Sequence, residues 1–399
     1  MPVLWTCSPS WEWAFRAAAD GGDENVGGSE NNAEVAWRAW EKVDKLTALP
    51  SYDRSQGNAL LRIEAVDDEN CQSAEERKTP SVTWFGAGCF DSLGDKDMLW
   101  MVLERLGLER FVPATSVLVW DVDKVDQVLL PATADDLVVL KPPLGCHGEG
   151  IVFFETGPSK ARETQERILA IISEDAKRAR AERGFLEHLL QRKGRLPGWV
   201  LQAHIRSMLL QGDRKFHLRA YVLADDAKQT LFRYATMEAR VAEMAYNATD
   251  CNDRASHITN GAGGDRIQRV LVRELPELAA MQDRLDSFVD ELLADPGFRD
   301  AVFNHAHRPP ERKARFGGRF AIGALDLMID DTGRPWILEV NARSPGCAPE
   351  GTGSAAFQAH MCELAGELLR FGAASLDDEP VEVREDGFQP VAQVCESDK

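Results

Sequence analysis

The sequence lacks the features that mark several common classes of protein. Its 8 cysteines include no C-x-x-C pair, which argues against a zinc site and against a disulfide framework. There is no run of about eighteen apolar residues, the length that a membrane-spanning helix needs. The first residues also lack the basic region followed by an apolar region that begins a secretory signal. We therefore expect a cytoplasmic protein without a membrane partner.

The chain has fewer basic residues than acidic residues. The chain has 46 Lys and Arg residues against 65 Asp and Glu residues, which gives a formal net charge of -19. Nucleic acids and anionic membranes attract clusters of positive charge. The composition therefore argues against generalised binding to nucleic acid, although it leaves room for a local basic groove.

Two common nucleotide-binding signatures are absent as well. The chain has neither the G-K-[S/T] end of a Walker A motif nor a G-x-G-x-x-G that opens a helix. Instead, Lys141 precedes a turn with glycines at 145, 148 and 150, between the apolar stretches 137–140 and 151–154. Such glycines let a backbone approach an anion closely, and a lysine at a strand end can contact phosphate. The turn is either a phosphate-binding flap or an ordinary hairpin turn.

The strongest chemical signal is a predicted hairpin at residues 321–345. Two apolar stretches flank the turn residues Asp330 to Gly333. Three oxygen-bearing side chains, Asp326, Glu339 and Asn341, lie in or just after these stretches. A buried carboxylate needs a partner, and Mg²⁺ prefers oxygen ligands of this kind. The residues themselves leave two alternatives, a metal site or ion pairs with Arg or Lys.

A further predicted strand carries three basic residues. Lys215, His217 and Arg219 alternate with apolar residues and so share one face. This face either binds an anion such as a polyphosphate or is a solvated outer face. In another predicted strand, residues 199–205, Gln202 interrupts an apolar run at an expected domain boundary. It marks either a hinge that reads an adenine edge or a glutamine satisfied within the fold.

Hydrophobic periodicity predicts the other elements. In the predicted helix 95–108, the apolar face includes Met98, Met101 and Val102. Residues 231–242 read as a single strand, and the acidic residues from 376 onward read as a loose tail. The other predicted helices span residues 10–20, 31–43, 158–195, 274–295 and 354–371.

The order of these motifs resembles that of the tubulin-tyrosine-ligase-like family of ATP-grasp ligases. The resemblance runs from about Asp95 to Leu369 and rests on LGDKDMLW, LVVLKPPLGCHGEGI, WVLQAHI, GDRKFHLRAYVL, EARVAEMAY, SHITN, and GALDLMID followed by PWILEVNARSP. It implies an α/β (α+β) ATP-grasp fold, with ATP held between a central and a C-terminal α/β domain and with a smaller N-terminal domain. The expected division is residues 1–115, 116–200 and 201–375, followed by the acidic tail at 376–399.

The same resemblance implies roles for individual residues. Asp326, Glu339 and Asn341 match magnesium ligands, which would bridge ATP phosphates and neutralise their charge. The residues implied at the reaction centre are Lys215, Arg219 and Arg240. The residues implied in binding ATP are Lys96, Lys141, Gly148, Gly150, Gln202, Ala203, His204, Ile205, Lys215, His217 and Asn260. The implied cofactors are ATP and Mg²⁺.

The implied activity is ATP-dependent amide formation. A carboxylate is phosphorylated to an acyl phosphate, and the amine of an amino acid attacks it to form a C–N bond. The expected partners are an amino acid and a carboxylate acceptor on tubulin or another protein, which implies a cytoskeleton-associated location. A chain of this negative charge needs a local basic surface, such as residues 307–315, to approach an acidic protein tail.

His217 departs from the family pattern, which usually has aspartate in its K-F-D-L-R motif. A histidine removes or reverses a negative charge at a position expected near the nucleotide or the substrate amine. Two other functions therefore stay open: an ATP-grasp ligase with a small-molecule or peptide acceptor, and a catalytically silent scaffold that binds nucleotide. The complete Asp326, Glu339 and Asn341 set favours an enzyme.

Overall fold

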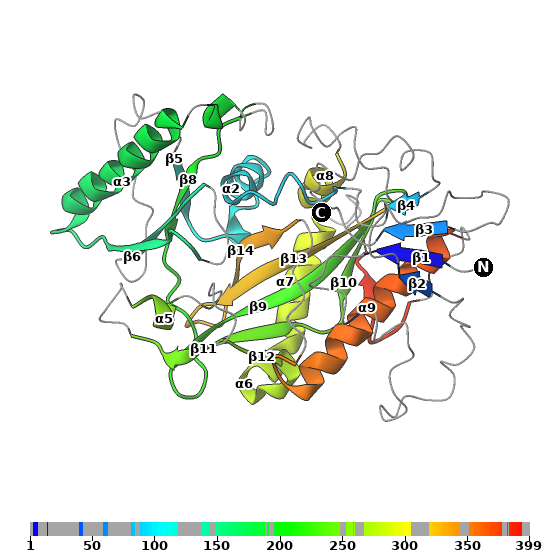
Figure 1. Ribbon diagram of the computed structural model, residues 1–399. Coiled ribbons are helices and arrows are strands. Elements are labelled where there is room, and N and C mark those ends of the chain that lie inside the picture. Colours follow the sequence, from blue (N-terminus) through cyan, green and yellow to red (C-terminus); the bar gives the residue numbers. More distant parts are fainter. Residues whose placement is uncertain are drawn as a thin grey trace.

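The computed structural model describes residues 3–6, 14, 40–42, 59–62, 81–83, 88–118, 137–143, 148–182, 184–187, 190, 195–247, 253–257, 259, 267–304, 319–342, 351–376, 381 and 383–392 (Figure 1). These residues form three β-sheets with helices packed against them. The expectation of a mixed α/β protein is confirmed.

The largest sheet has seven strands, and β9 (Arg214–Asp225) lies at its centre. On one edge, β9 pairs with β13 (Phe320–Ile329), which pairs in turn with β14 (Pro335–Asn341). On the other edge, it pairs with β11 (Glu238–Ala245) along its first half and with β10 (Thr230–Tyr234) along its second half. All these pairs are antiparallel, so directly opposite residues share a face. The outer strands are β12 (Ile267–Leu271), beside β11, and β15 (Phe388–Pro390), beside β10.

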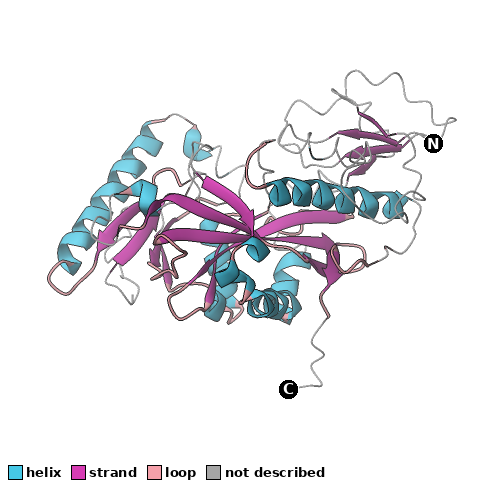
Figure 2. Cartoon of the chain, turned by 90° about the horizontal axis from the view of Figure 1, so that it is seen from below, coloured by secondary structure: helices cyan, strands magenta, loops and turns pink. Residues whose placement is uncertain are grey.

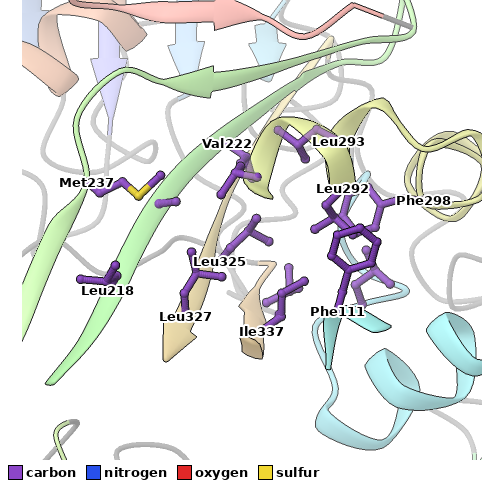
Figure 3. Close-up of a cluster of buried hydrophobic side chains, with 14 of the residues drawn as sticks. Phe111, Leu218, Val222, Met237, Leu292, Leu293, Phe298, Leu325, Leu327 and Ile337 are labelled. Atoms are coloured by element: carbon purple, nitrogen blue, oxygen red, sulfur yellow. The ribbon is translucent and has the colours of Figure 1, made fainter. Parts of the chain in front are cut away.

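One face of this sheet forms the main hydrophobic core. The even-numbered residues of β9 from 216 to 224, including Leu218 and Val222, are buried there, as the two-residue periodicity predicts. Figure 3 shows these side chains and Leu325 of β13 on the side where Leu292 and Phe298 approach from the helices. Those helices are α7 (Gln282–Ala294) and α8 (Pro296–Phe303).

The sequence of the two helices explains where they form. Helix α7 buries Leu285, Val289 and Leu292, which are spaced to lie on one helical face. Asp295 ends this helix and begins the next, because its carboxylate accepts hydrogen bonds from the first N–H groups of α8. Pro296 then occupies the first turn, where a missing N–H costs nothing.

The opposite face of β9 divides into an apolar and a polar half. Toward the C-terminal end of the strand, Tyr221 and Leu223 pack in a second hydrophobic core with α9 (Ala355–Leu376). Toward the N-terminal end, the same face carries Lys215, His217 and Arg219. All three basic side chains are buried, so this face is not a solvated outer face.

A second sheet has four antiparallel strands in the order β5-β8-β6-β7. Its strands are β5 (Thr115–Leu118), β6 (Leu137–Lys141), β7 (Val152–Glu155) and β8 (Trp199–Ala203), and α3 (Ala161–Ala181) packs on it. Strands β6 and β7 confirm the predicted strands on both sides of the glycine-bearing turn. The long helical segment expected from residue 158 is likewise confirmed for the range of α3.

A small parallel sheet lies at the other end of the molecule. Its order is β2-β1-β3-β4, with β1 (Val3–Thr6), β2 (Trp40–Lys42), β3 (Ala59–Arg62) and β4 (Ser81–Thr83). Figures 1 and 2 both place it far from α3, with the seven-stranded sheet between them. The remaining short elements are a 3-10 turn at Glu109–Phe111 (η5), another at Val272–Glu274 (η7), and the helices α5 (Arg254–His257) and α6 (Pro276–Ala279).

Three sequence-based expectations about local structure are wrong. Residues 40–42 of the expected helix 31–43 are strand β2, because pairing with β1 overrides the local pattern. The expected single strand 231–242 is β10 and β11, separated by residues 235–237 where pairing to β9 is interrupted. The expected helix 274–295 is divided between α6 and α7.

The C-terminal residues also differ from the expected loose tail. Strand β15 pairs with β10, and its Phe388 is fully buried against Tyr234 and Phe371. The predicted helix near residue 95 is α2 (Lys96–Arg105), but its core face differs from the prediction. Met101 is 46% exposed, whereas Leu99 is only 3% exposed. None of the helices in the described part of the chain is long and apolar enough to cross a membrane.

The core of the large sheet gives a test of its packing. A Cβ at Gly323, in β13, would lie 2.9 Å from Cδ2 of the buried Phe90. We expect Gly323→Ala to lower the free energy of unfolding by about 1 to 3 kcal/mol, because the packed core has no room to relax. Urea denaturation measures this difference.

Gly157→Ala is the matched control, since a Cβ there meets nothing within 4 Å. Its effect should stay within about 0.5 kcal/mol. Equal stability of the two variants would contradict the close packing of Phe90 against β13.

Candidate functional site

A row of charged side chains crosses four strands of the large sheet. Strand register places Glu238 of β11 opposite Arg219 of β9, Arg219 opposite Asp326 of β13, and Asp326 opposite Glu339 of β14. Antiparallel register puts these four residues on one face. The row therefore gathers residues that lie more than a hundred positions apart in the sequence.

Arg219 and Asp326 form the centre of this row. The guanidinium donates to both carboxylate oxygens, from Nε to Oδ1 over 2.8 Å and from an Nη to Oδ2 over 2.9 Å. Both residues are buried, at 4% and 2% exposure. Burial alone would raise the pKa of Asp326, but the charge and hydrogen bonds of Arg219 hold that pKa well below its usual range. The ion-pair alternative raised by the sequence is therefore observed for Asp326.

Glu339 lies at the carboxylate end of the row. Burial, the charge of Asp326 and a hydrogen bond with Asp326 raise the pKa of Glu339, while Lys96 and Lys141 oppose the rise. Asn341 joins the pair, because its Nδ2 donates to Oδ2 of Asp326 over 3.1 Å. Two adjacent carboxylates and an amide form an oxygen-rich group in which a cation would relieve the repulsion.

These three side chains are compatible with the predicted magnesium site, but their arrangement does not test that prediction. The described residues contain no group of three or more His, Cys, Asp and Glu side chains placed to hold a metal. Mg²⁺, however, commonly uses only one or two carboxylates and takes its other ligands from water and phosphate. Asp326, Glu339 and Asn341 match that pattern, so their role as magnesium ligands stays a prediction.

Two lysines approach Glu339 from outside the large sheet. Lys141 ends β6 of the second sheet, and Lys96 opens α2. Burial lowers the pKa of Lys141 to about 8, with Glu339 raising it and Lys96 lowering it further. Lys141 thus stays largely protonated at neutral pH. The two cations and the carboxylates meet where the second sheet faces the large one.

Asp97 and Gly94 fix the position of Lys96. Arg195 donates to both carboxylate oxygens of Asp97, and the N–H of Gly198, at the start of β8, donates to the same group over 2.7 Å. Gly94 lies so close to the end of β14 that a Cβ there would come within 2.6 Å of Cβ of Ala342. These contacts tie the first turn of α2 to both sheets.

The side chain of Gln202 and the N–H groups of the two residues after it already have hydrogen-bond partners. The Oε1 of Gln202 accepts from Lys141 Nζ over 2.7 Å, and its Nε2 donates to Thr115 over 3.0 Å. The N–H groups of Ala203 and His204 donate to backbone carbonyls over 2.7 and 3.1 Å. These two N–H groups are therefore already paired within the protein. An adenine contact by residues 202 to 205 stays a prediction.

Lys215 lies among aromatic rings next to this segment. Its Nζ is 3.0 Å from Nε2 of His204 and 4.6 Å from the ring centroid of Tyr246. The rings of Phe153, from the flap strand β7, and His257 are 4.8 Å apart. His257 also lies 5.0 Å from the ring of Tyr246. The flap, the hinge and the basic strand therefore meet around Lys215, and Tyr246 and Phe153 are contacts that sequence reasoning missed.

His217 is buried in the middle of the site, and only one of its two ring nitrogens has a hydrogen-bond partner among the described residues. Its Nδ1 lies 2.6 Å from the hydroxyl of Thr259, but its Nε2 has no hydrogen-bond partner among the described residues. Burial lowers the pKa of His217 to about 3, so the ring is neutral at neutral pH. An unpartnered buried polar atom costs about 1 to 3 kcal/mol, which requires an explanation.

Glu238 is the residue of the charged row that sequence reasoning did not identify. It is fully buried and accepts hydrogen bonds from Nε of Arg240 and, over 3.1 Å, from the hydroxyl of Tyr221. Arg269 of β12 forms a second ion pair, in which its Nη1 lies 3.5 Å from Oε1 of Glu238. The signal was present, because Glu238 precedes Arg240 by two residues in one strand and must share its face.

The structure describes two of the three glycines of the predicted flap. Gly148 and Gly150 adopt positive φ angles of 73° and 70°, which favour glycine. The other members of that turn, residues 144–147, lie outside the described residues, as does Asn260. Among the predicted site residues, the structure brings together Lys96, Lys141, Arg219, Asp326, Glu339 and Asn341, while phosphate binding by the flap stays a prediction.

Comparison with known proteins places the chain in a family. A sequence profile described as the Tubulin-tyrosine ligase family matches residues 89–363, which is more than half of the chain. The protein therefore belongs to the tubulin-tyrosine ligase family, and the resemblance seen in its motifs is confirmed.

Individual relatives are distant. The chain is 22% identical to a tubulin glycylase of Tetrahymena thermophila over 170 residues, 39% of this chain and 16% of that protein. It is 25% identical over 215 residues to a probable tubulin–tyrosine ligase of Schizosaccharomyces pombe, covering 51% of each. It is 23% identical over 246 residues to a probable tubulin polyglutamylase of Caenorhabditis elegans, 58% of this chain and 52% of that protein. The chain thus spans about half, or much less, of the relatives it matches.

Glu238 makes the stability of the site depend on pH. Arg240 and Arg219 hold the pKa of Glu238 down to about 2, despite burial that would raise it from 4.5. Because the folded-state pKa lies below the unfolded value, the stabilisation is complete above about pH 4.5 and is lost as the pH falls toward 2. This loss should amount to about 3 kcal/mol.

Replacing this carboxylate should reproduce that loss at neutral pH. We expect Glu238→Gln to lower the free energy of unfolding by about 3 to 5 kcal/mol, because the buried guanidinium of Arg240 and the partly buried one of Arg269 lose their shared partner. The variant should also lose the corresponding slope of stability between pH 4.5 and 2. Denaturant titrations across this pH range provide the measurement, with the exposed Glu187→Gln as control. A variant that keeps the wild-type pH slope would show that Glu238 is not the titrating group.

Proposed function

We propose that the protein is an ATP-dependent ligase that joins an amino acid to a carboxylate of tubulin or another protein. The single observation that carries this proposal is the meeting of Lys96 and Lys141 with the carboxylates of Asp326 and Glu339 at the end of the charged row. Cations suited to phosphate thus lie beside oxygens suited to a divalent metal. Family membership supports the same reaction class.

The proposed fold is ATP-grasp, with nucleotide held where the second sheet faces the large sheet. The central domain, residues 116–200, would supply the flap, and the C-terminal domain, residues 201–375, would supply the charged row. Residues 1–115 would form the smaller N-terminal domain. The position of Lys141 at the end of the flap strand, close to Glu339 of the large sheet, supports this arrangement.

Magnesium would be held by Asp326, Glu339 and Asn341. When bound, it would neutralise charge on the phosphates during their transfer. The chain supports this role by its preorganisation: Arg219 orients Asp326 through two hydrogen bonds, and Asn341 restrains the same carboxylate. Asp326 therefore reaches the site without needing to rotate.

The cationic residues would orient the reacting groups. Lys141 and Lys96 would contact the phosphates, and Lys215 would reach the nucleotide beside Tyr246. In the proposed reaction, the acceptor carboxylate attacks the γ-phosphorus and ADP leaves. The amine of the amino acid then attacks the acyl phosphate, and phosphate leaves with formation of the amide bond. Arg219 and Arg240 would hold the negatively charged acyl phosphate in line.

The choice of a protein acceptor follows the relatives, whose names all refer to tubulin. These names differ in the amino acid added, so they do not select one for this chain. A cytoplasmic, cytoskeleton-associated location goes with this proposal. The basic segment at 307–315, which would help a chain of charge -19 approach an acidic tail, lies outside the described residues.

His217 favours a second candidate, an ATP-grasp ligase with a small-molecule or peptide acceptor. Its neutral, buried ring stands beside Arg219 and Arg240, so no carboxylate at this position would receive a substrate ammonium. A silent nucleotide-binding scaffold is the further alternative. The complete set of Asp326, Glu339 and Asn341 argues against this alternative.

The nucleotide proposal predicts a metal-dependent gain in stability. ATP at about a hundred times its dissociation constant should stabilise the folded protein by about 2.7 kcal/mol, but only with Mg²⁺ present. Glu339→Gln should abolish this gain, because it removes a charged metal ligand. Thermal unfolding with ATP, with Mg²⁺ and with both measures the effect.

Glu104→Gln is the control for this experiment, since Glu104 is an exposed residue of α2 away from the carboxylate pair. It should retain the full shift. An unchanged melting temperature of the wild type under every condition would refute the ligase proposal, and a full shift in Glu339→Gln would refute the metal assignment.

An amino-acid screen separates the two acceptor classes. The protein is incubated with Mg²⁺, ATP and one labelled amino acid at a time, with either tubulin or a panel of small acids and peptides. The proposal predicts label in the tubulin band for at least one amino acid. Label that enters only small products would exclude the protein acceptor in favour of the second candidate.

A further inference from the structure

We propose that Asp97 and Arg195 are positioning residues that hold the second sheet in place against the large sheet and thereby set the affinity for the metal–nucleotide complex. This inference rests on the proposed ligase function and deepens it, because it gives two residues outside the charged row a role in nucleotide binding. Neither residue needs to touch the nucleotide. They act through Lys96, which precedes Asp97 in the first turn of α2.

Helix α2 is fixed to the large sheet by its apolar face. Leu99, Val102 and Leu103 are buried in the main hydrophobic core, in the same cluster as Leu218 of β9 and Leu325 of β13. A close-packed core of this kind resists displacement of its members. The position of α2 therefore follows that of the large sheet.

The second sheet has a hydrophobic core of its own. Val138 of β6, Leu201 of β8 and Ile168 of α3 are buried together in it. In the described part of the chain, this cluster shares no residue with the main core. Apolar packing inside each core therefore leaves the placement of one sheet against the other open, and polar contacts at their boundary can fix it because hydrogen bonds are directional.

The carboxylate of Asp97 supplies such contacts. It is 2% exposed, and its Oδ2 accepts from the N–H of Gly198, just before β8, over 2.7 Å. Arg195 donates from Nη2 to Oδ1 over 2.9 Å and from Nη1 to Oδ2, which makes a bidentate ion pair. Oδ1 also accepts from the N–H of Met98 over 2.9 Å. One buried carboxylate thus joins the first turn of α2 to the segment that leads into the second sheet.

Lys96 lies between this contact and a contact with the large sheet. On its other side, a Cβ at Gly94 would lie 2.6 Å from Cβ of Ala342, the residue that follows β14. The backbone before Lys96 therefore packs closely against the large sheet, while the side chain of Asp97 binds the segment 195–198. Lys96 is held at the junction of the two sheets.

The placement of the second sheet decides how the site is assembled. The charges of Lys96 and Lys141 both act on Glu339, and Lys96 also acts on Lys141. These three residues come from α2, the second sheet and the large sheet, so their separations change if the second sheet moves. A nucleotide that contacts all three elements binds most tightly when they are already in position, because ordering them during binding costs free energy.

The alternative is an ion pair that only stabilises the fold, and Arg233 provides the comparison. Arg233 of β10 lies opposite Val222 of β9, so it is on the sheet face that α7 covers and not on the face of the charged row. It pairs with Asp286 and Asp290 of α7. Arg233→Gln is therefore a matched control that removes a guanidinium from ion pairs within the large sheet and its helix.

The first measurement needs no nucleotide. Difluorodinitrobenzene, a short cross-linker, joins lysine amines that lie close together, and mass spectrometry of the digested full chain quantifies the link between Lys96 and Lys141. Arg195→Gln should lower the yield of this link several-fold, because the two lysines lie on the elements that the Asp97–Arg195 pair holds together. Arg233→Gln should give the wild-type yield. A wild type that forms no such link would overturn the proposal.

The second measurement is the dissociation constant of Mg·ATP by calorimetry with the full chain. Asp97→Asn and Arg195→Gln should each weaken binding about tenfold, the usual effect of removing a residue that orients a ligand-binding group. The double variant should bind within about threefold of the weaker single variant, because the two residues act as one unit. Arg195→Lys keeps the charge but not the bidentate geometry, so its affinity should fall between those of Arg195→Gln and the wild type. Arg233→Gln should stay within about twofold of the wild type.

Thermal unfolding shows whether each variant is folded. Asp97 is buried, whereas 27% of the Arg195 side chain is exposed. If Asp97→Asn does not fold, Arg195→Gln and Arg195→Lys still separate the positioning role from a general loss of stability.

Failure of this inference and failure of the proposed function give different results. Wild-type protein that binds no Mg·ATP contradicts the proposed function, and a reduced cross-link in Arg195→Gln would still support placement of the sheets by this pair. Wild-type protein that binds Mg·ATP no more tightly than Asp97→Asn and Arg195→Gln overturns the positioning role alone. Equal weakening by Arg233→Gln overturns it as well, because the effect would then follow general stability.

Discussion

The buried pair of Arg219 and Asp326 is the interaction on which the site depends. It joins the central strand β9 to β13 through two hydrogen bonds in a setting where either charge alone would be strongly destabilising. It also fixes register, because a one-residue slip would turn Arg219 into the hydrophobic core. Once this register is set, Glu238 and Glu339 lie at the two ends of the same row.

The polar half of the sheet face exists because helix α9 covers only the apolar half. Tyr221 and Leu223 pack beneath the helix, whereas Lys215 and Arg219 continue the same face beyond that core. The lysines at the site come from elsewhere, Lys141 from the second sheet and Lys96 from α2. The site is therefore built by two sheets and a helix. The ion pair of Asp97 with Arg195 and its hydrogen bond from the N–H of Gly198 join the helix to the second sheet, and Gly94 packs against the end of β14 in the large sheet.

The local arrangement of charges at the site differs from the overall charge of the chain. The chain carries a net charge of -19, but Arg240 and Arg269 both pair with Glu238 inside the fold. Burial makes the local arrangement dominant, because interactions between buried charges are screened far less than those at the surface. The position of the buried charges, rather than the net charge of the chain, therefore decides the electrostatics of the site.

The sequence by itself determined strands β6 to β9, the shared face of Lys215, His217 and Arg219, and the hairpin with Asp326 and Glu339, because two-residue periodicity is a local property of the chain. It also determined family membership through the order of its motifs. It could not show that β2 is a strand, that β15 joins the sheet, or that Glu238 holds Arg240 and Arg269. Those features depend on pairing between distant segments, and only the tertiary structure decides which buried charges become neighbours.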